Sequence, residues 1–163
     1  MTHLEIIKSK IFGRDQIKGQ LAIWRFPDKK IVWTNGCFDL LHLGHIDYLS
    51  KAKDQGDILI VGVNTDLSVK RIKKQGRPIN DENARATLVA SLHFVDAVIL
   101  FDEDTPYKMI KMIQPDVLVK GSDYKIEDIV GADIVKANGG KVVTIDLLPG
   151  YSTSAIEEKI KNA

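Results

Sequence analysis

The sequence predicts an α/β protein with a five-stranded parallel sheet covered by helices on both faces. Short apolar runs alternate along the chain with amphipathic stretches, which is typical of βαβ units. These runs are apolar at nearly every position, as expected for strands that are buried on both faces. At 163 residues, the chain also has the length of one domain that can bury a core.

The elements follow in order along the chain. The apolar runs predict strands at residues 31–34, 58–64, 97–101, 117–120 and 141–145. The stretches between and after them predict helices at 44–54, 66–72, 82–92, 106–113, 131–137 and 153–161. Residues 1–29 are less informative and allow a helix at 15–24 followed by a turn at Pro27-Asp28. We therefore expect a single domain of residues 1–163, with an N-terminal extension (1–29) before a core (30–163).

Composition narrows the function classes. The formal net charge is +1, and no long basic run interleaved with aromatic residues occurs, so we expect no nucleic-acid partner. A single cysteine excludes an internal disulfide framework. We see neither a signal peptide nor an apolar run long enough to span a bilayer, so we expect a cytoplasmic protein with no membrane partner.

Residues 34–45, T-N-G-C-F-D-L-L-H-L-G-H, lie where the first strong strand passes into a helix. The first N–H groups of a helix have no partner within it, and the helix dipole places partial positive charge there, so this is a favourable phosphate site. Gly44 allows a ligand to approach the backbone. His42 and His45 are three residues apart and fall on one helical face, where both can point at one anion.

Other readings of the two histidines are less specific. A histidine near a helix start is usually a cap or a satisfied core residue, but the upstream T-x-G-x-F-D favours function. A zinc site is disfavoured, because the i, i+4 spacing of the helical zinc motif is absent and the chain has one cysteine. We expect no metal ligands from the protein here.

The dodecapeptide resembles the signature of the nucleotidyltransferase superfamily, which shares H-x-G-H with class I aminoacyl-tRNA synthetases, pantetheine-phosphate adenylyltransferases and glycerol-3-phosphate cytidylyltransferases. From about residue 30 onward, the chain is similar to D-glycero-β-D-manno-heptose 1-phosphate adenylyltransferases, including the C-terminal half of the bifunctional heptose kinase/adenylyltransferase. The further matching motifs are G-V-N-T-D (62–66), G-R-P-I-N (76–80), F-D-E-D-T-P (101–106), P-D-V-L-V-K-G-S-D-Y (115–124) and G-Y-S-T (150–153).

This resemblance implies a Rossmann-like nucleotidyltransferase fold and adenylyl transfer from ATP to the heptose 1-phosphate, with pyrophosphate released. It also implies Mg²⁺, held mainly by phosphate oxygens and water, and a homo-oligomer, a dimer or larger. The small-molecule partners that the resemblance implies are ATP and a sugar 1-phosphate.

Site residues follow from the motifs. The resemblance implies that Lys70, with Lys73 and Lys74 as alternatives, holds the β and γ phosphates together with Arg85. A solvated helix face is the alternative for these residues. Lys120 to Tyr124 would serve the adenine, ribose or sugar, with Ser122 where the family usually has a second glycine; a positive φ there is then not required.

The hydroxyls at 152 and 153 either cap a helix or bind phosphate as well. Asp39 orders the loop or a metal-bound water. The expected catalytic residues are His42, His45, Lys70 and Arg85. The expected nucleotide-binding residues are Thr34, Asn35, Gly36, Cys37, Phe38, Asp39, Gly44, Lys120, Gly121, Asp123, Tyr124, Ser152 and Thr153.

Three rival functions remain. A cytidylyltransferase acting on glycerol 3-phosphate or a related alcohol phosphate is the nearest, because the motifs do not fix the base. A synthetase fragment is disfavoured by the short chain, the missing K-M-S-K-S loop and the lack of a basic face for tRNA. A nucleotide sensor without catalysis could lose both histidines, and both are present.

Overall fold

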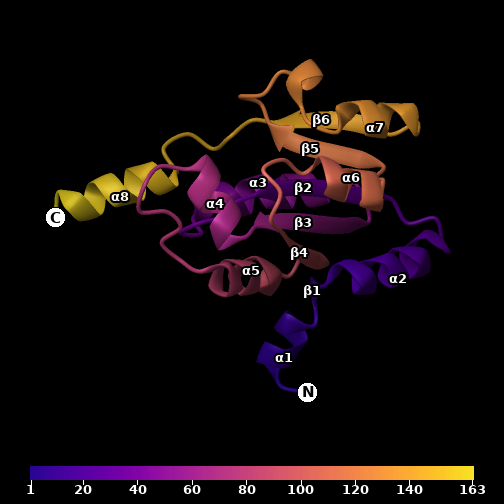
Figure 1. Ribbon diagram of the computed structural model, residues 1–163, viewed down its shortest axis with the longest axis horizontal. Coiled ribbons are helices and arrows are strands. Elements are labelled where there is room, and N and C mark those ends of the chain that lie inside the picture. The colour runs from indigo at the N-terminus through magenta and orange to yellow at the C-terminus, as the bar shows by residue number, and fades with distance from the viewer.

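The computed structural model describes residues 1–163 and contains one parallel sheet flanked by helices (Figure 1). The sheet has six strands in the order β1-β4-β3-β2-β5-β6, and every neighbouring pair is parallel. The strands are β1 (Ile11–Phe12), β2 (Ile31–Gly36), β3 (Ile58–Asn64), β4 (Ala97–Phe101), β5 (Val117–Gly121) and β6 (Lys141–Ile145). The helices are α1 (His3–Lys8), α2 (Arg14–Arg25), α3 (Leu43–Lys53), α4 (Asp66–Ile72), α5 (Glu82–Ser91), α6 (Tyr107–Ile113), α7 (Ala132–Ala137) and α8 (Thr153–Lys161), with a short 3-10 turn η1 (Ile126–Asp128).

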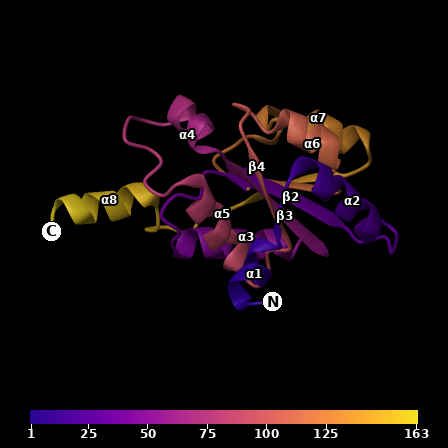
Figure 2. The ribbon, with the colours of Figure 1, turned by 60° about the horizontal axis from the view of Figure 1, so that its bottom comes forward.

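Two hydrophobic clusters cover the two faces of the sheet. Apolar residues of α2, α6 and α7 form one cluster with Ile31 and Trp33, and those of α3 and α5 form the other with Val32. Figure 2 shows the two groups of helices on opposite sides of the strands. Because successive residues of a strand point to opposite faces, β2 needs apolar residues at consecutive positions, which explains its uninterrupted apolar run.

The predicted α/β class and parallel sheet are confirmed, but the predicted number of five strands is wrong. All five predicted strands are present, and β1 adds a sixth by pairing with β4 at the sheet edge. A two-residue strand is too short to show a periodic pattern. Beside it, α2 buries Ile17 and Leu21 in the core, so residues 11–25 pack with the sheet.

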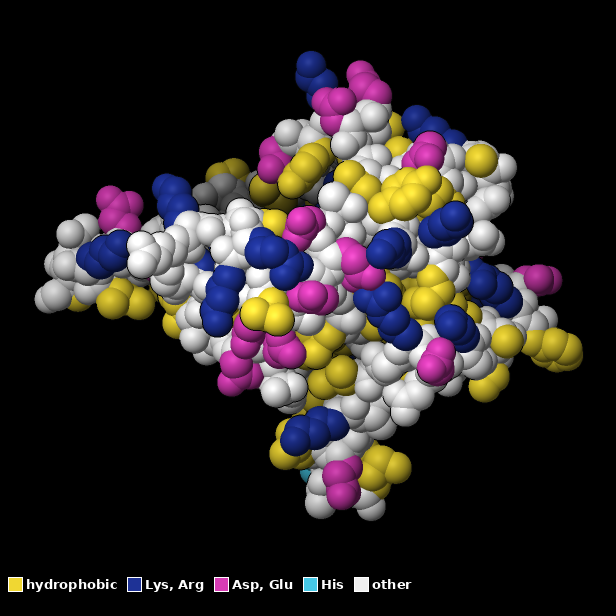
Figure 3. All heavy atoms as spheres, in the orientation of Figure 1, with side chains coloured by type: hydrophobic (Ala, Val, Ile, Leu, Met, Phe, Trp, Pro, Cys, Tyr) yellow, Lys and Arg dark blue, Asp and Glu magenta, His cyan; other side chains and the backbone are white.

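The order of the strands determines where a ligand can bind. From β2 the chain moves outward through β3 and β4, then returns to place β5 on the other side of β2. The order reverses between β2 and β5, and open α/β sheets bind ligands beyond the carboxyl ends of the strands at such a point. No helix is both long and apolar enough to cross a membrane. Basic and acidic side chains are interspersed on the face seen in Figure 3.

Candidate active site

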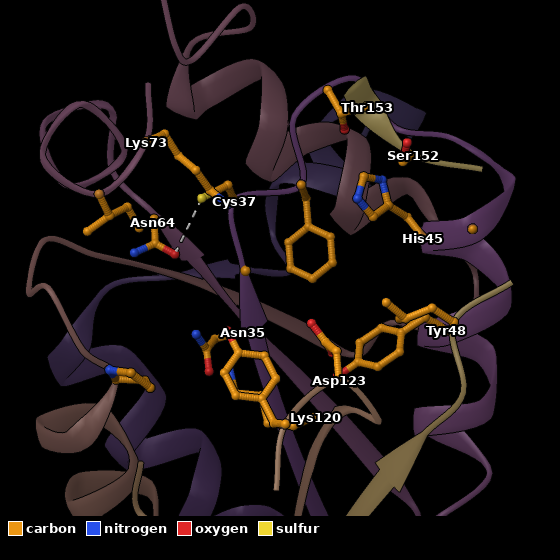
Figure 4. A pocket seen from close by; sticks show the side chains of 18 of the residues that line it. Asn35, Cys37, His45, Tyr48, Asn64, Lys73, Lys120, Asp123, Ser152 and Thr153 are labelled. Carbon is orange, nitrogen blue, oxygen red and sulfur yellow. Dashed lines mark hydrogen bonds between the residues drawn. The ribbon is translucent and has the colours of Figure 1, made fainter. Parts of the chain in front are cut away.

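A cavity of about 520 Å³ lies at the carboxyl ends of β2 and β5. It is lined by residues from the β2–α3 loop, the first turn of α3, the end of α4, the end of β5 and the start of α8 (Figure 4). Of the predicted site residues, it brings together Asn35, Gly36, Cys37, Phe38, His42, Gly44, His45, Lys120, Gly121, Asp123, Tyr124, Ser152 and Thr153. Four others, Thr34, Asp39, Lys70 and Arg85, do not line it.

The two histidines form a stacked pair at the start of α3. His42 is the N-cap residue and His45 lies in the first turn, with ring centroids 3.8 Å apart and planes inclined by 21°. Phe38 meets the His45 ring edge-on at 5.4 Å. Burial lowers the pKa of His42, and burial together with the neighbouring His42 lowers the pKa of His45 to about 4. The Nδ1 atoms of both rings are buried and have no hydrogen-bond partner.

Gly44 has a packing role that the sequence did not reveal. A Cβ at this position would lie 3.0 Å from the His42 ring and 3.1 Å from the carbonyl oxygen of Tyr151. The missing side chain therefore lets the segment before α8 approach α3, and this approach closes one wall of the cavity.

The loop before the histidines is held by Asp39. Phe38 and Leu40 have φ values of 51° and 49°, in the left-handed region that side chains other than glycine rarely adopt. The buried carboxylate of Asp39 accepts hydrogen bonds from the N–H groups of Ile79 (2.7 Å) and Asn80 (3.0 Å). Burial by itself would raise the pKa of Asp39. These two bonds and the nearby guanidinium of Arg77 outweigh burial and hold the pKa below its usual value. Of the two roles left open for Asp39, the structure shows loop ordering.

Arg85 does not lie where the resemblance implied. Its side chain is 0% exposed and donates to the carbonyl oxygens of Asn80 (3.0 Å) and Cys37 (2.7 Å) and to Asp66 Oδ1 (2.9 Å). A buried guanidinium needs partners for its N–H groups, and these partners are within the protein. Arg85 therefore does not line the cavity, and its guanidinium holds the loop at Cys37.

The basic segment after β3 contributes one lysine to the cavity. Lys70 lies exposed on α4, and neither it nor Lys74 lines the cavity. Lys73 does line it, from the extended backbone position that ends α4. The structure thus places Lys73, one of the two alternatives to Lys70, at the cavity.

A second group of polar side chains lies near the end of β5. Burial lowers the pKa of Lys120 to about 8, and its Nζ lies 5.6 Å from the centre of the Tyr124 ring. The Oδ1 atom of Asn35 is buried without a partner. A Cβ on Gly121 would lie 2.5 Å from Asp123 Oδ1, so the glycine makes room for that carboxylate. Figure 4 shows Asn35, Lys120 and Asp123 in a different part of the cavity from Lys73 and the hydroxyls of Ser152 and Thr153.

The hydroxyl groups divide between the cavity and the protein interior. Thr34 is fully buried, and its Oγ1 lies 2.8 Å from the hydroxyl of Tyr48, which donates to the Val119 carbonyl at 3.2 Å. These two hydrogen bonds therefore tie Tyr48 of α3 to both β2 and β5. Ser152 caps α8, and the Thr153 hydroxyl donates to the Asp39 carbonyl oxygen at 2.8 Å. Both of these residues also line the cavity.

Several lining residues were missed, among them Asn64, Asp104, Thr105, Leu147 and Leu148. Each lies at or shortly after the carboxyl end of β3, β4 or β6. Because open α/β sheets bind ligands beyond the carboxyl ends of their strands, a search of the residues after every predicted strand could have found them. The structure contains no group of three or more His, Cys, Asp or Glu residues that could hold a metal ion.

Residues 33–159 match the cytidylyltransferase-like family. The chain belongs to the cytidylyltransferase-like family. This membership confirms the resemblance to the nucleotidyltransferase superfamily that the motifs indicated.

Relatives in this family extend over nearly all of the chain. The bifunctional protein HldE of Campylobacter jejuni subsp. doylei is 52% identical over 155 residues, which are 95% of this chain and 32% of that protein. HldE of Citrifermentans bemidjiense is 53% identical over 152 residues, 93% of this chain and 31% of that protein. The chain spans about a third of the length of these relatives.

Solved structures agree on the fold. The lipopolysaccharide core biosynthesis protein of Thermoplasma volcanium has a TM-score of 0.63 and 34% sequence identity, covering 74% of this chain and 98% of that one. Pantoate-beta-alanine ligase of Francisella tularensis, with a TM-score of 0.59 and 16% identity, covers 93% of this chain and 76% of that one, and shows only that the fold is shared.

Proposed function

We propose that this member of the cytidylyltransferase-like family transfers the adenylyl group of ATP to D-glycero-β-D-manno-heptose 1-phosphate, giving ADP-heptose and pyrophosphate. The observation that carries the chemistry is the stacked pair of His42 and His45 at the start of α3, with both Nδ1 atoms buried and unpartnered beside the cavity. The order of the motifs and the relationship to HldE proteins support the substrate. The alternative, a cytidylyltransferase for glycerol 3-phosphate, is not favoured by these relatives.

The reaction is an in-line displacement. An oxygen of the sugar 1-phosphate attacks the α-phosphorus of ATP, the bond from that phosphorus to the bridging oxygen breaks, and pyrophosphate leaves with the electron pair. The protein orients the reactants and stabilises charge, so it needs no nucleophile of its own. His42 and His45 act at the α-phosphate, and Lys73 acts at the β and γ phosphates.

Mg²⁺ belongs to this proposal as part of the MgATP substrate. The one buried carboxylate, that of Asp39, already accepts hydrogen bonds from backbone N–H groups and the Arg77 guanidinium. We therefore propose that phosphate oxygens and water hold the ion, which neutralises charge on the departing pyrophosphate.

The polar groups at the β5 end suit hydroxyls better than phosphates. Asn35 Oδ1 and the carboxylate of Asp123 can accept hydrogen bonds from a ligand, whereas Lys120 can donate them. A sugar hydroxyl can donate and accept, but a fully ionised phosphate cannot donate. We propose that this part of the cavity takes sugar hydroxyls and that the phosphates lie toward the histidines and Lys73.

A screen for pyrophosphate release tests the proposal. ATP and CTP are each offered with the α and β anomers of heptose 1-phosphate, glycerol 3-phosphate, phosphopantetheine and FMN. ADP-heptose is expected to form at least about tenfold faster than CDP-heptose, a preference of about 1.4 kcal/mol. Equal rates, or a preference for CTP and glycerol 3-phosphate, would assign the chain to the cytidylyltransferases.

The assembly and location of the enzyme are further parts of the proposal. The family resemblance supports a homo-oligomer, a dimer or larger, which light scattering on the purified chain tests. A monomer in solution would contradict the proposed homo-oligomer. The proposed use of ATP supports a cytoplasmic site of action.

A further inference from the structure

Helix α8 reaches the cavity without being anchored in the hydrophobic core. It extends away from the body of the molecule in both ribbon views (Figures 1 and 2), and none of its residues is buried. Ile160 near its end is 68% exposed. Yet Ser152 and Thr153 at its start line the cavity. Since apolar packing normally fixes a helix against a domain, the position of these hydroxyls must depend on other contacts.

Hydrogen bonds join α8 to two residues of the active-site loops, Asp39 and Arg77. The Thr153 hydroxyl donates to the Asp39 carbonyl oxygen at 2.8 Å. One arm of the Arg77 guanidinium donates to Glu157 Oε2 on α8 at 2.6 Å, and the other donates to Asp39 Oδ2 at 3.2 Å. The side chains of Arg77, Asp39 and Glu157 are 16%, 5% and 29% exposed. A single guanidinium therefore joins two carboxylates from segments far apart in the sequence.

Three cavity-forming segments converge on Arg77. It lies in the connection between α4 and α5, which carries Lys73, and it contacts the loop of Asp39 and the helix of Glu157. An isolated ion pair at a surface adds little to stability. Here the arginine is largely buried, and its planar fork matches two acceptors at once, so the contact fixes direction as well as distance.

We propose that Arg77 and Glu157 are positioning residues for nucleotide binding, holding the start of α8 and the Lys73 segment over the phosphates. The proposal rests on the proposed nucleotidyl transfer, since it assumes that ATP occupies the cavity. Neither residue lines the cavity, so both act through Lys73, Ser152 and Thr153.

Glu157→Gln removes one charge from this contact, and Glu158→Gln is its matched control. Glu158 is the next residue of α8, is exposed and makes no side-chain ion pair or hydrogen bond. Three quantities are measured for each variant: the Kd of MgATP by calorimetry, the KM and kcat of pyrophosphate release, and the hydrogen exchange of the α8 amides. Arg77→Lys is the second variant, because one ammonium cannot reproduce the two-armed contact.

Glu157→Gln is expected to raise the Kd and KM for MgATP about tenfold, with kcat within about threefold and faster exchange along α8. Glu158→Gln should match the wild-type enzyme in all three measurements. Arg77→Lys should resemble Glu157→Gln; if it does not fold, Glu157→Gln decides alone.

Equal Kd values and equal exchange rates in Glu157→Gln and Glu158→Gln would overturn the positioning role. So would a lower melting temperature with an unchanged Kd in the folded fraction. These results are distinct from a failure of the proposed function, in which the wild-type enzyme itself would neither bind nor use ATP.

Discussion

Replacing His45 is expected to lower kcat much more than it weakens ATP binding. Burial and the neighbouring His42 lower the pKa of His45 to about 4, so the ring is neutral at pH 7. A neutral imidazole can donate a hydrogen bond to the α-phosphate as charge develops there. Loss of one such donor costs about 10² to 10³ in rate, or about 2.7 to 4 kcal/mol. Binding of ATP should change by less than about threefold, because the interaction strengthens mainly in the transition state.

Two replacements separate chemistry from packing. The His45 ring stacks on His42 at 3.8 Å and meets Phe38 at 5.4 Å, so alanine removes aromatic contacts worth about 0.5 to 1.5 kcal/mol each in addition to the donor. Phenylalanine fills the same space but cannot donate. His45→Phe should therefore lose as much rate as His45→Ala while keeping a melting temperature closer to that of the wild-type enzyme.

The assay is continuous pyrophosphate release at saturating MgATP and heptose 1-phosphate, with the folded fraction measured on the same sample. His45→Gln, whose side-chain amide can donate, should lie between phenylalanine and wild type. If folded His45→Phe kept kcat within about tenfold of wild type, below the loss expected for one donor, the stacked histidines would have a structural role and the assignment would be refuted.

The remaining predictions concern the same cavity. Changing both Ser152 and Thr153 to alanine should cost about 1 kcal/mol of stability for the lost cap and also weaken ATP binding, whereas a destabilised protein with a normal ATP Kd would show that the hydroxyls only cap. Lys73→Met should raise the KM for ATP much more than Lys70→Met does, because only Lys73 lines the cavity; equal effects on KM would contradict this. The low pKa of His45 makes stability fall as pH drops from 6.5 toward 4, because the unfolded chain binds the proton first. His45→Phe should therefore flatten that part of the curve of melting temperature against pH, and an unchanged curve would argue against the shift.

Sequence alone predicted the fold where a local pattern was decisive. Every residue of β3 is buried, and its apolar run, which ends one residue before Asn64, made the strand predictable. In contrast, β1 exists because Ile11 and Phe12 pair with Val98 and Ile99, which are distant in the sequence. No property of two residues taken alone distinguishes such an edge strand from a loop.

The same contrast holds for the site. The histidine pair was predictable from its place at the turn from strand to helix, although His42 is the extended N-cap residue and only His45 lies within α3. The roles of the basic residues were not, because they depend on where α4 ends and how α5 is rotated against the sheet. Helix α4 ends at Ile72, and the next residue adopts φ −113° and ψ 168°, which separates Lys73 from Lys70 in direction. Helix α5 turns Arg85 into the interior.

The positive side chains around the cavity divide into two kinds with different tasks. Arg77 and Arg85 contact carboxylates and backbone carbonyls of the protein and hold the loop in which Phe38 and Leu40 have positive φ. The lysines that line the cavity, Lys73 and Lys120, have no ion pair in the structure. This division follows from their chemistry: a planar fork satisfies several fixed acceptors at once, whereas a compact ammonium on a flexible stem can adapt to a phosphate or a hydroxyl. We therefore expect Arg77 and Arg85 to make no direct phosphate contact, and the loss of either should act on the ligand through the segments that it holds.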